Sequence, residues 1–454
     1  MTRITDSALY GHLWGTEELR SILEEPGRLQ SWLDILAALA RAQTEVGIAP
    51  EEAADAIARH ARIERLDLGL VAAETRRSGH STLGLIRGLQ AVLPLEGREW
   101  IYHGATVQDL TDTWTAFTMK RVGGVIWRDL RRVEARLLEL AERHRDTLMA
   151  GRTHGQLGAP ITFGYKAAGW ADEVRRHLQR LREGGPRWFV GQLGGGVGTL
   201  AFFGERGLEL RRRFCARLGL GDPGISWLSS RDRVAEFVHL LALISSTLAR
   251  IGNEVCELQR TEIGELFEPS SPDSVGSITM PHKRNPEMSE HLVTLARLVR
   301  ASAGVVLEGT VQSHERDGRS WKAEWVAFPE ACLLTGTALE LAHQILAGLG
   351  VREEAMRANL GECLVSEKVL SLLAPLLGKH RAQMLVHEAL AEGRERGRSL
   401  VEAIAASEAL SRHLDPEVLH SLIARPDPGA APRMTDEVVA RGWIERAREP
   451  EVWP

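Results

Sequence analysis

The chain has 454 residues, more than one simple hydrophobic core normally holds, so we expect two or three domains. Hydrophobic residues make up 44% and charged residues 26%, which is ordinary for a soluble globular protein. The net charge of -5 argues against nucleic acid or an anionic membrane surface as the main partner.

The start of the chain, MTRITDSALYGHLWGTEELR, lacks the apolar centre of a signal peptide. The most apolar run, Phe237 to Ala249, is shorter than a membrane span, and His239 within it fits a buried helix better. The cysteines are far apart and show no C-x-x-C spacing, so we interpret them as core thiols of a cytoplasmic protein. They are Cys215, Cys256, Cys332 and Cys363.

Amphipathic helices dominate the chain. Residues 128–145 repeat leucine and valine at spacings of three and four, which predicts a helix with one buried stripe. The positions of this stripe are Leu130, Val133, Leu137 and Leu140. Residues 232–260 contain no proline and are apolar on more than one face, which predicts a central helix packed by neighbours or by other subunits. Residues 289–312 predict another long helix.

Glycine and proline interrupt these helices in a few places. The stretch LGGGVGT, residues 193–199, predicts a turn without the strand and helix that flank a dinucleotide site. Residues 346–354 predict a domain junction, and residues 425–434 a loop that closes a small C-terminal helical domain.

Three polar clusters stand out from this helical background: residues 103–113, 151–164 and 274–290. Each places small hydroxyl, amide or imidazole groups beside glycine near a helix end, where unpaired backbone groups favour ligands. Taken singly, each also fits a structural role. Thr106 and Asp109 fit helix caps, and His154 fits a core histidine. Because all three clusters occur together, a catalytic site explains them better than chance.

The third cluster contains GSITMPHKRNP, residues 276–286, which closely resembles the G-S-S-x-M-P-x-K-x-N-P signature of the fumarase/aspartase superfamily. GATVQD (104–109) and GRTHGQ (151–156) follow the order of that superfamily's other two active-site regions. GGVGTLAFFGERG and HERDGRSWKAEW are similar to the branch that holds adenylosuccinate lyases and 3-carboxymuconate cycloisomerases.

This resemblance implies an all-α, three-domain subunit whose central helices pack into a homotetramer. Each active site would then draw its three regions from three different subunits. The expected domains are an N-terminal helical domain at 1–105, a central helix bundle at 106–350 and a C-terminal helical domain at 351–454. The implied reaction is β-elimination from a small dicarboxylate to give fumarate, without a metal or cofactor.

Removing a proton beside a carboxylate requires a base and fixed donors around the developing negative charge. The resemblance implies that Ser277 is the base and that Lys283 and Asn285 hold the carboxylate. It also implies that Glu290 pairs with His154 and raises the basicity of its ring. The further implied substrate contacts are Thr106, Gln108, Thr153, His80, Arg20 and Arg316. The residue types also predict that Asn285 caps the following helix and that Pro286 lies in its first turn.

The chain departs from the family pattern at four positions. Ile278 replaces the second signature serine, and Val107 replaces a hydroxyl residue that contacts a carboxylate. Beside His80, Ser81 stands where adenylosuccinate lyases have aspartate, and His154 is a histidine that cycloisomerases lack. We therefore expect a specialised elimination enzyme of this branch.

Valine donates no hydrogen bond, so the carboxylate would rely on Thr106, Gln108 and the Lys283 loop. An uncharged nitro group beside Val107 would fit this better, and nitrosuccinate lyase is the leading interpretation. The alternatives are adenylosuccinate lyase, 3-carboxy-cis,cis-muconate cycloisomerase and a non-catalytic structural homologue.

Overall fold

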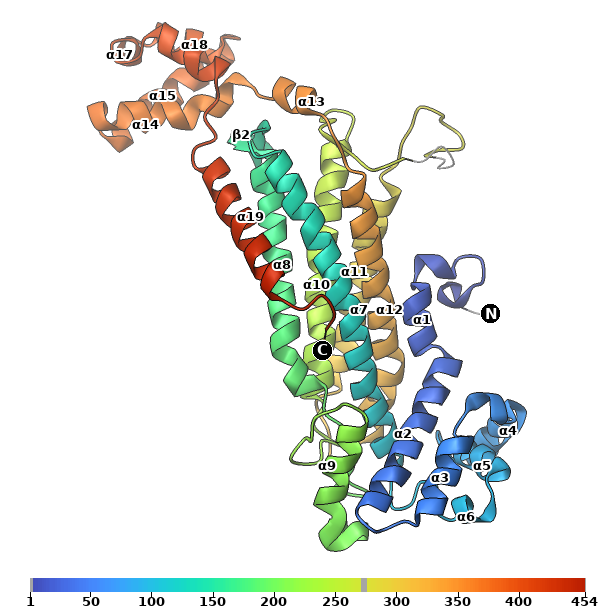
Figure 1. Ribbon diagram of the computed structural model, residues 1–454. Helices are drawn as coiled ribbons and strands as arrows, with labels where there is room; N and C mark the ends of the chain where they lie inside the picture. Colours follow the sequence, from blue (N-terminus) through green and yellow to red (C-terminus); the bar gives the residue numbers. More distant parts are fainter. Residues whose placement is uncertain (1–2, 271–275, 454) are drawn as a thin grey trace.

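The computed structural model describes residues 3–270 and 276–453, and its secondary structure is almost entirely helical (Figure 1). Five long helices lie side by side as a central bundle. They are α7 (Val107–Arg143), α8 (Phe163–Trp188), α10 (Asp232–Gln259), α11 (Glu287–Glu308) and α12 (Gly318–Ala347). The short helix α9 (Gly207–Arg217) lies at the lower end of the bundle in Figure 1.

The predicted amphipathic stripe is confirmed inside α7. Leu130, Val133 and Leu137 are fully buried, and Leu140 is nearly so. The helix is longer than residues 128–145 because its first half carries a second set of buried side chains from residue 108 onward. Burying apolar side chains along the whole length of a helix stabilises it more than helix propensity does.

Helix α10 is long and apolar enough, by length and composition, to cross a membrane, and it alone meets that test over the described residues. However, 72% of its most apolar window is buried inside the bundle. It packs against α8, α11 and α12, which is the arrangement of a core helix and confirms the predicted central helix at 232–260.

The N-terminal helices form the lower right part of the molecule in Figure 1. They are α1 (Glu17–Leu23), α2 (Glu25–Glu45), α3 (Glu51–His60), α4 (Leu68–Ser78), α5 (Leu83–Val92) and α6 (Leu95–Arg98). The longest, α2, packs against α7 and α9 through Trp32, Leu33 and Leu36, which join the same core as the bundle. Short 3-10 turns occur at Ile4–Asp6, Gly11–Leu13, Ile63–Arg65, Ala201–Arg206 and Glu362–Val365.

Two small antiparallel sheets lie at the upper end of the bundle. Strands β1 (Leu148–Thr153) and β2 (Gln156–Thr162) form a hairpin between α7 and α8. Strands β3 (Leu266–Phe267) and β4 (Gly350–Val351) join the segments that follow α10 and α12. The predicted domain junction at 346–354 therefore contains β4, which pairs with β3 after α10.

The C-terminal helices have a separate small core at the top of Figure 1. They are α14 (Ser366–Leu377), α15 (Lys379–Glu395), α16 (Leu400–Ala406), α17 (Glu408–Ser411) and α18 (Pro416–Ala424). The helix before them, α13 (Glu353–Ala358), places Met356 in the core of the bundle instead. The last helix, α19 (Ala431–Arg448), leaves this group and packs along α8 and α7. The predicted C-terminal unit at 351–454 is thus divided in the structure.

Buried charge holds the returning tail on the bundle. Arg175 on α8 donates to Glu134 on α7, with Nε 2.6 Å from Oε1, and to Glu449 after α19, with Nη1 2.6 Å from Oε2. All three side chains are almost fully buried, so each charge is stabilised in the core by the opposite charge beside it. No sequence pattern near residue 431 indicates this docking, because the partners lie about three hundred residues away.

Two of the predicted core thiols are confirmed. Cys215 and Cys332 are free and buried, and Cys256 is free and partly buried. The side chain of Cys363 lies outside the described part of the chain.

Candidate active site

Thr106 and Arg316 meet at the lower end of the bundle, immediately before α7. Nη1 of Arg316 donates to the Thr106 hydroxyl at 3.0 Å, and its Nη2 donates to the Gly196 carbonyl at 3.0 Å. The Thr106 N–H donates to Asp109 Oδ2 at 2.9 Å, which caps the helix and confirms the structural interpretation of Asp109. Two predicted substrate contacts are therefore side by side in one subunit.

Asp109 also fixes the glycine-rich turn. Its carboxylate accepts the N–H groups of Gly194 at 2.8 Å and Gly195 at 3.0 Å. Burial raises the pKa of Asp109 to about 6, although these hydrogen bonds act in the opposite direction. The same turn contains Gly196, whose carbonyl accepts a hydrogen bond from Arg316. Asp109 therefore attaches this turn to the first turn of α7.

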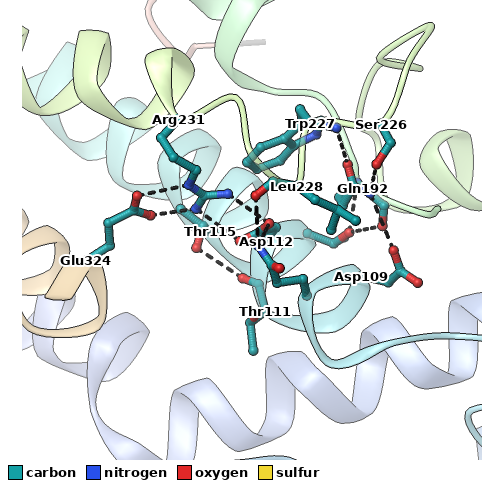
Figure 2. A network of polar contacts seen from close by, with 12 residues as sticks. Asp109, Thr111, Asp112, Thr115, Gln192, Ser226, Trp227, Leu228, Arg231 and Glu324 are labelled. Carbon is teal, nitrogen blue, oxygen red and sulfur yellow. Dashed lines mark hydrogen bonds and ion pairs between the residues drawn. The ribbon is translucent and has the colours of Figure 1, made fainter. Parts of the chain in front are cut away.

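A buried ion network lies beside the first turns of α7 (Figure 2). Arg231 donates to Asp112 through Nη1 and Nη2, at 2.9 and 3.1 Å, and to Glu324 through Nε at 2.9 Å. All three residues are less than 9% exposed, and they come from three different parts of the chain. A bidentate guanidinium fixes orientation as well as charge, so this network sets the positions of α7, α10 and α12 relative to one another.

Gln108, a predicted substrate contact, belongs to this buried network. Its side chain is 0% exposed, and its Nε2 donates to Asp112 Oδ2 at 3.2 Å and to the Leu228 carbonyl at 3.0 Å. Its amide nitrogen is therefore occupied within the chain, and its contact with a substrate stays a prediction.

His80 lies in the exposed turn between α4 and α5. Its Nδ1 accepts the N–H groups of Thr82 at 3.4 Å and Leu83 at 3.3 Å, so the ring caps the first turn of α5. In this arrangement Nδ1 is the acceptor, and a neutral ring carries its proton on Nε2.

The hairpin β1–β2 carries Thr153 and His154 at the upper end of the bundle. Thr153 pairs with Gln156, which leaves His154 and Gly155 as a two-residue turn with φ of 54° and 74°. Positive φ at both positions matches a type I′ hairpin turn. Both predicted site residues are exposed, and the alternative interpretation of His154 as a core histidine is therefore wrong.

The signature loop lies at the same upper end and folds back on itself (Figure 1). A Cβ at Gly276 would lie 2.7 Å from the Lys283 carbonyl, so only glycine allows this approach. The partly buried Ser277 accepts the Met280 N–H at Oγ, at 3.0 Å, and such a bond favours the deprotonated form of a hydroxyl. Ile278 is 94% exposed and Lys283 is also exposed. The first two residues of the predicted cluster, Ser274 and Val275, lie outside the described residues.

The start of α11 corrects the predicted cap. The helix begins at Glu287 after Pro286, and Asn285 donates to Glu287 Oε1 at 3.2 Å instead of capping the backbone. Glu268, from the segment after α10, accepts the N–H groups of Met288 and Ser289. A carboxylate at this position satisfies the free donors and favours the helix dipole.

Glu290 is exposed on the first turns of α11. Over the residues that the structure describes, no hydrogen bond or ion pair joins it to His154 within the subunit. The pairing of these two side chains stays a prediction.

The side chain of Arg20 holds the N-terminal segment together by hydrogen bonds to its backbone. Its Nε donates to the Gly15 carbonyl at 3.2 Å, and its Nη2 donates to the carbonyls of Thr5 at 2.9 Å and Gly11 at 2.6 Å. A guanidinium whose donors already satisfy backbone carbonyls has little capacity for a substrate, so this geometry argues against the predicted carboxylate contact.

The predicted site residues are thus divided between the two ends of one subunit. Thr106 precedes α7 and His154 follows it, and the 37 residues of α7 span roughly 55 Å at 1.5 Å per residue. Arg316 lies with Thr106, whereas the signature loop before α11 lies at the upper end of the bundle, as the β1–β2 hairpin does. No single subunit brings these groups within hydrogen-bonding distance.

Sequence reasoning missed Glu268 and the ion network around Arg231. A glutamate in a loop and an arginine before a helix are unremarkable locally, and no spacing rule links Arg231 to Asp112 or Glu324. No helix predicted from the sequence includes Asp112 or Glu324, because the predicted helices cover 128–145, 232–260 and 289–312.

The comparisons with known proteins agree with this fold and arrangement. The model of the family described as "Lyase" matches residues 11–301. The N-acetyl-S-(2-succino)cysteine lyase of Dickeya dadantii is 41% identical over 96% of this chain and 97% of its own. The nitrosuccinate lyase of Streptomyces davaonensis is 36% identical over 97% of this chain and 96% of its own.

Among solved structures, the 3-carboxy-cis,cis-muconate lactonizing enzyme of Pseudomonas putida aligns with a TM-score of 0.88 and 33% identity. The alignment covers 96% of this chain and 99% of that enzyme. The likeness therefore extends over all parts of the subunit, including both ends of the bundle. The chain belongs to the fumarase/aspartase superfamily of lyases, in the branch that holds adenylosuccinate lyases and 3-carboxymuconate cycloisomerases.

Proposed function

We propose that this enzyme releases fumarate from a 2-succinyl thioether of an N-acetylated cysteine. The observation that carries the proposal is the 41% identity to the N-acetyl-S-(2-succino)cysteine lyase across 96% of the chain. In the reaction, a proton leaves the carbon beside one carboxylate and the C–S bond to the neighbouring carbon breaks. The products are fumarate and the free thiol.

In this proposal Ser277 removes the proton. Its Oγ accepts the Met280 N–H, which favours the alkoxide, and the exposed Lys283 of the same loop stabilises the charge that develops on the substrate. His154, projected by the hairpin turn, protonates the leaving group, and Glu290 of another subunit orients its ring.

A thiolate suits this site because it is a good leaving group. The pKa of a cysteine thiol is about 8.5, far below that of an alcohol, so the departing sulfur needs little help from an acid. The substrate also has no phosphate group and requires no nucleotide pocket.

We propose that the enzyme works as a homotetramer whose sites combine the two ends of different subunits. The separation of Thr106 from His154 by the length of α7 supports this assembly. Apolar side chains exposed on the bundle support it too, since they suit contact with another subunit. They are Leu243, Leu298, Val305 and Val326, with exposed fractions of 39% to 57%.

Nitrosuccinate is a second candidate substrate, and Val107 is the observation that favours it. An apolar side chain beside the substrate tolerates a nitro group more readily than a carboxylate, which would lose a hydrogen bond there. The 36% identity to a nitrosuccinate lyase over 97% of the chain supports this option.

The test is steady-state kinetics on purified enzyme with several substituted succinates. We expect N-acetyl-S-(2-succino)cysteine to give fumarate, seen by its ultraviolet absorbance, and one thiol per fumarate. Nitrite release from nitrosuccinate with no thiol release from the thioether would favour the second candidate. Efficient turnover of adenylosuccinate alone would contradict both.

A further inference from the structure

The hairpin that carries His154 contains an irregularity just before its turn. The register of β1 with β2 shifts between Ala150 and Arg152. A Cβ at Gly151 would lie 2.8 Å from the Ala159 carbonyl oxygen, so a larger residue at this position would collide with β2. Such a bulge bends a strand and turns the following side chain in a new direction. The side chain that follows the bulge is that of Arg152.

Arg152 pairs with Glu265, a glutamate that lies outside the hairpin. Nη2 of Arg152 donates to Glu265 Oε1 at 2.6 Å, and Nη1 donates to Oε2 at 3.0 Å. The Glu265 side chain is 0% exposed and that of Arg152 is 19% exposed. Two parallel bonds from a planar guanidinium fix direction as well as distance. Because a buried charge also requires its partner, this pair attaches the hairpin to the segment after α10.

Glu265 is held in place by its backbone and by a second side-chain donor. Its N–H donates to the Leu258 carbonyl at 2.8 Å, and its carbonyl accepts the Arg352 N–H at 2.9 Å. Nδ2 of Asn359, the residue after α13, donates to Glu265 Oε1 at 2.8 Å and to the Ile263 carbonyl at 2.9 Å. The end of α10, the segment around α13 and the hairpin therefore meet at one carboxylate.

The tip of the hairpin has few contacts of its own. Thr153, His154 and Gly155 are all exposed. Over the residues that the structure describes, no hydrogen bond joins the His154 ring to the rest of its subunit. Exposed segments with few contacts open more readily than the core does. The direction of His154 therefore depends on what fixes the strand beneath it, and Arg152 lies two residues away.

We propose that Arg152, Glu265 and Asn359 are positioning residues, which hold the hairpin turn where the imidazole of His154 reaches the leaving group. This inference rests on the proposed function, in which His154 is the acid. An acid must lie within hydrogen-bonding distance of the atom that it protonates, and a shift of about 1 Å can lower turnover about a hundredfold. The polar groups of the three residues are directed at one another, so they act on the reaction through the hairpin.

The test compares Arg152→Lys with a matched arginine beside the same hairpin. Lysine keeps the charge but lacks the planar fork, so we expect kcat to fall roughly tenfold or more while KM changes less than about threefold. Arg145, before β1, makes a similar contact with Asp436 through two bonds of 2.6 and 2.8 Å, but at the surface. Arg145→Lys should therefore stay within about twofold of wild type. A near-normal kcat in Arg152→Lys would overturn the inference.

A double-mutant cycle separates positioning from a general structural role. If Arg152 acts through His154, then adding Arg152→Lys to His154→Ala should lower kcat less than about twofold further. Fully additive losses would overturn the inference, because Arg152 would then support the fold or another residue. If thermal unfolding shows that Arg152→Lys does not fold, Asn359→Ala takes its place in the cycle, since it removes one donor to Glu265 and leaves the ion pair.

Hydrogen exchange provides a readout that requires no turnover. Mass spectrometry of the peptide covering residues 148–162 should show faster amide exchange in Arg152→Lys than in wild type or Arg145→Lys. Equal exchange in all three proteins would overturn the inference. Faster exchange in Arg152→Lys, with no fumarate released from the thioether by wild type, would contradict the proposed function and support the anchoring of the hairpin by Arg152.

Discussion

At the scale of single residues, the proposed role of Ser277 as the base can be tested by one substitution. Its Oγ accepts the Met280 N–H at 3.0 Å in a loop that glycine at position 276 allows to fold tightly. We expect Ser277→Ala to fold normally and to lower kcat roughly a hundredfold or more, as for other positioned proton-transfer groups. Ser411→Ala, on the exposed surface of α17, is the control for kinetics and thermal unfolding. Near-normal turnover of Ser277→Ala would remove this residue from the base role.

The raised pKa of Asp109 predicts how the stability of the fold changes with pH. Burial raises its pKa to about 6, above the value of about 3.9 in an unfolded chain. The folded protein therefore binds this proton more tightly than the unfolded chain does. The stability that the proton contributes is fully present below about pH 4 and is lost as pH rises through about 6. Relative to Asp109→Asn, wild type should gain stability as pH falls from 7 to 4. Urea unfolding of both proteins across this range measures the difference, and a constant difference would contradict the shifted pKa.

At the scale of elements, the cap of α11 links the helix to the signature loop. Glu268 accepts the N–H groups of Met288 and Ser289, and its own N–H donates to Gln259 Oε1 at 2.9 Å. Gln259 also donates to the Arg284 carbonyl at 3.1 Å, so one side chain holds both sides of the loop.

We expect Glu268→Gln to lower the free energy of unfolding by about 1 kcal/mol, the scale of a lost charged cap. It should also lower kcat/KM, because the first turn of α11 positions Asn285 and Glu290. Glu408→Gln, at an exposed glutamate paired with Arg412, is the control, since surface ion pairs contribute little. An unchanged Tm and unchanged kinetics would show that Glu268 is not needed to hold this turn.

The long helices were predictable because their stabilisation is periodic along the chain. Leu130, Val133 and Leu137 repeat at helical spacing, and all three are fully buried. The hairpin at 148–162 was missed because its strands contain glycine and proline and are short. The cap by Glu268 and the docking of α19 also escaped prediction, since each depends on partners distant in sequence.

At the scale of the whole molecule, the sequence predicts candidate site residues but not their positions in the fold. The signature around Ser277 predicts which side chains take part, but it contains no information on which end of the bundle each one occupies. The structure places Thr106 and Arg316 before α7, and the β1–β2 hairpin and the signature loop before α11 lie at the upper end of the bundle. An antiparallel arrangement of two subunits would bring opposite ends together, because a two-fold axis across the bundle exchanges them.

Shared sites predict that two inactive variants restore activity in mixed tetramers. If His154 and Ser277 reach one site from different subunits, then His154→Ala and Ser277→Ala chains should form some sites that are intact at both positions. With random mixing, half of the sites receive an intact histidine and half of those an intact serine, so about a quarter of wild-type activity should return. The chains are co-expressed with different tags, and doubly tagged tetramers are assayed for fumarate release. Mixing Ser277→Ala with Lys283→Ala is the matched control, because both residues lie on the same loop and no site becomes intact. Equal activity from the two mixtures would mean that each subunit builds its own site.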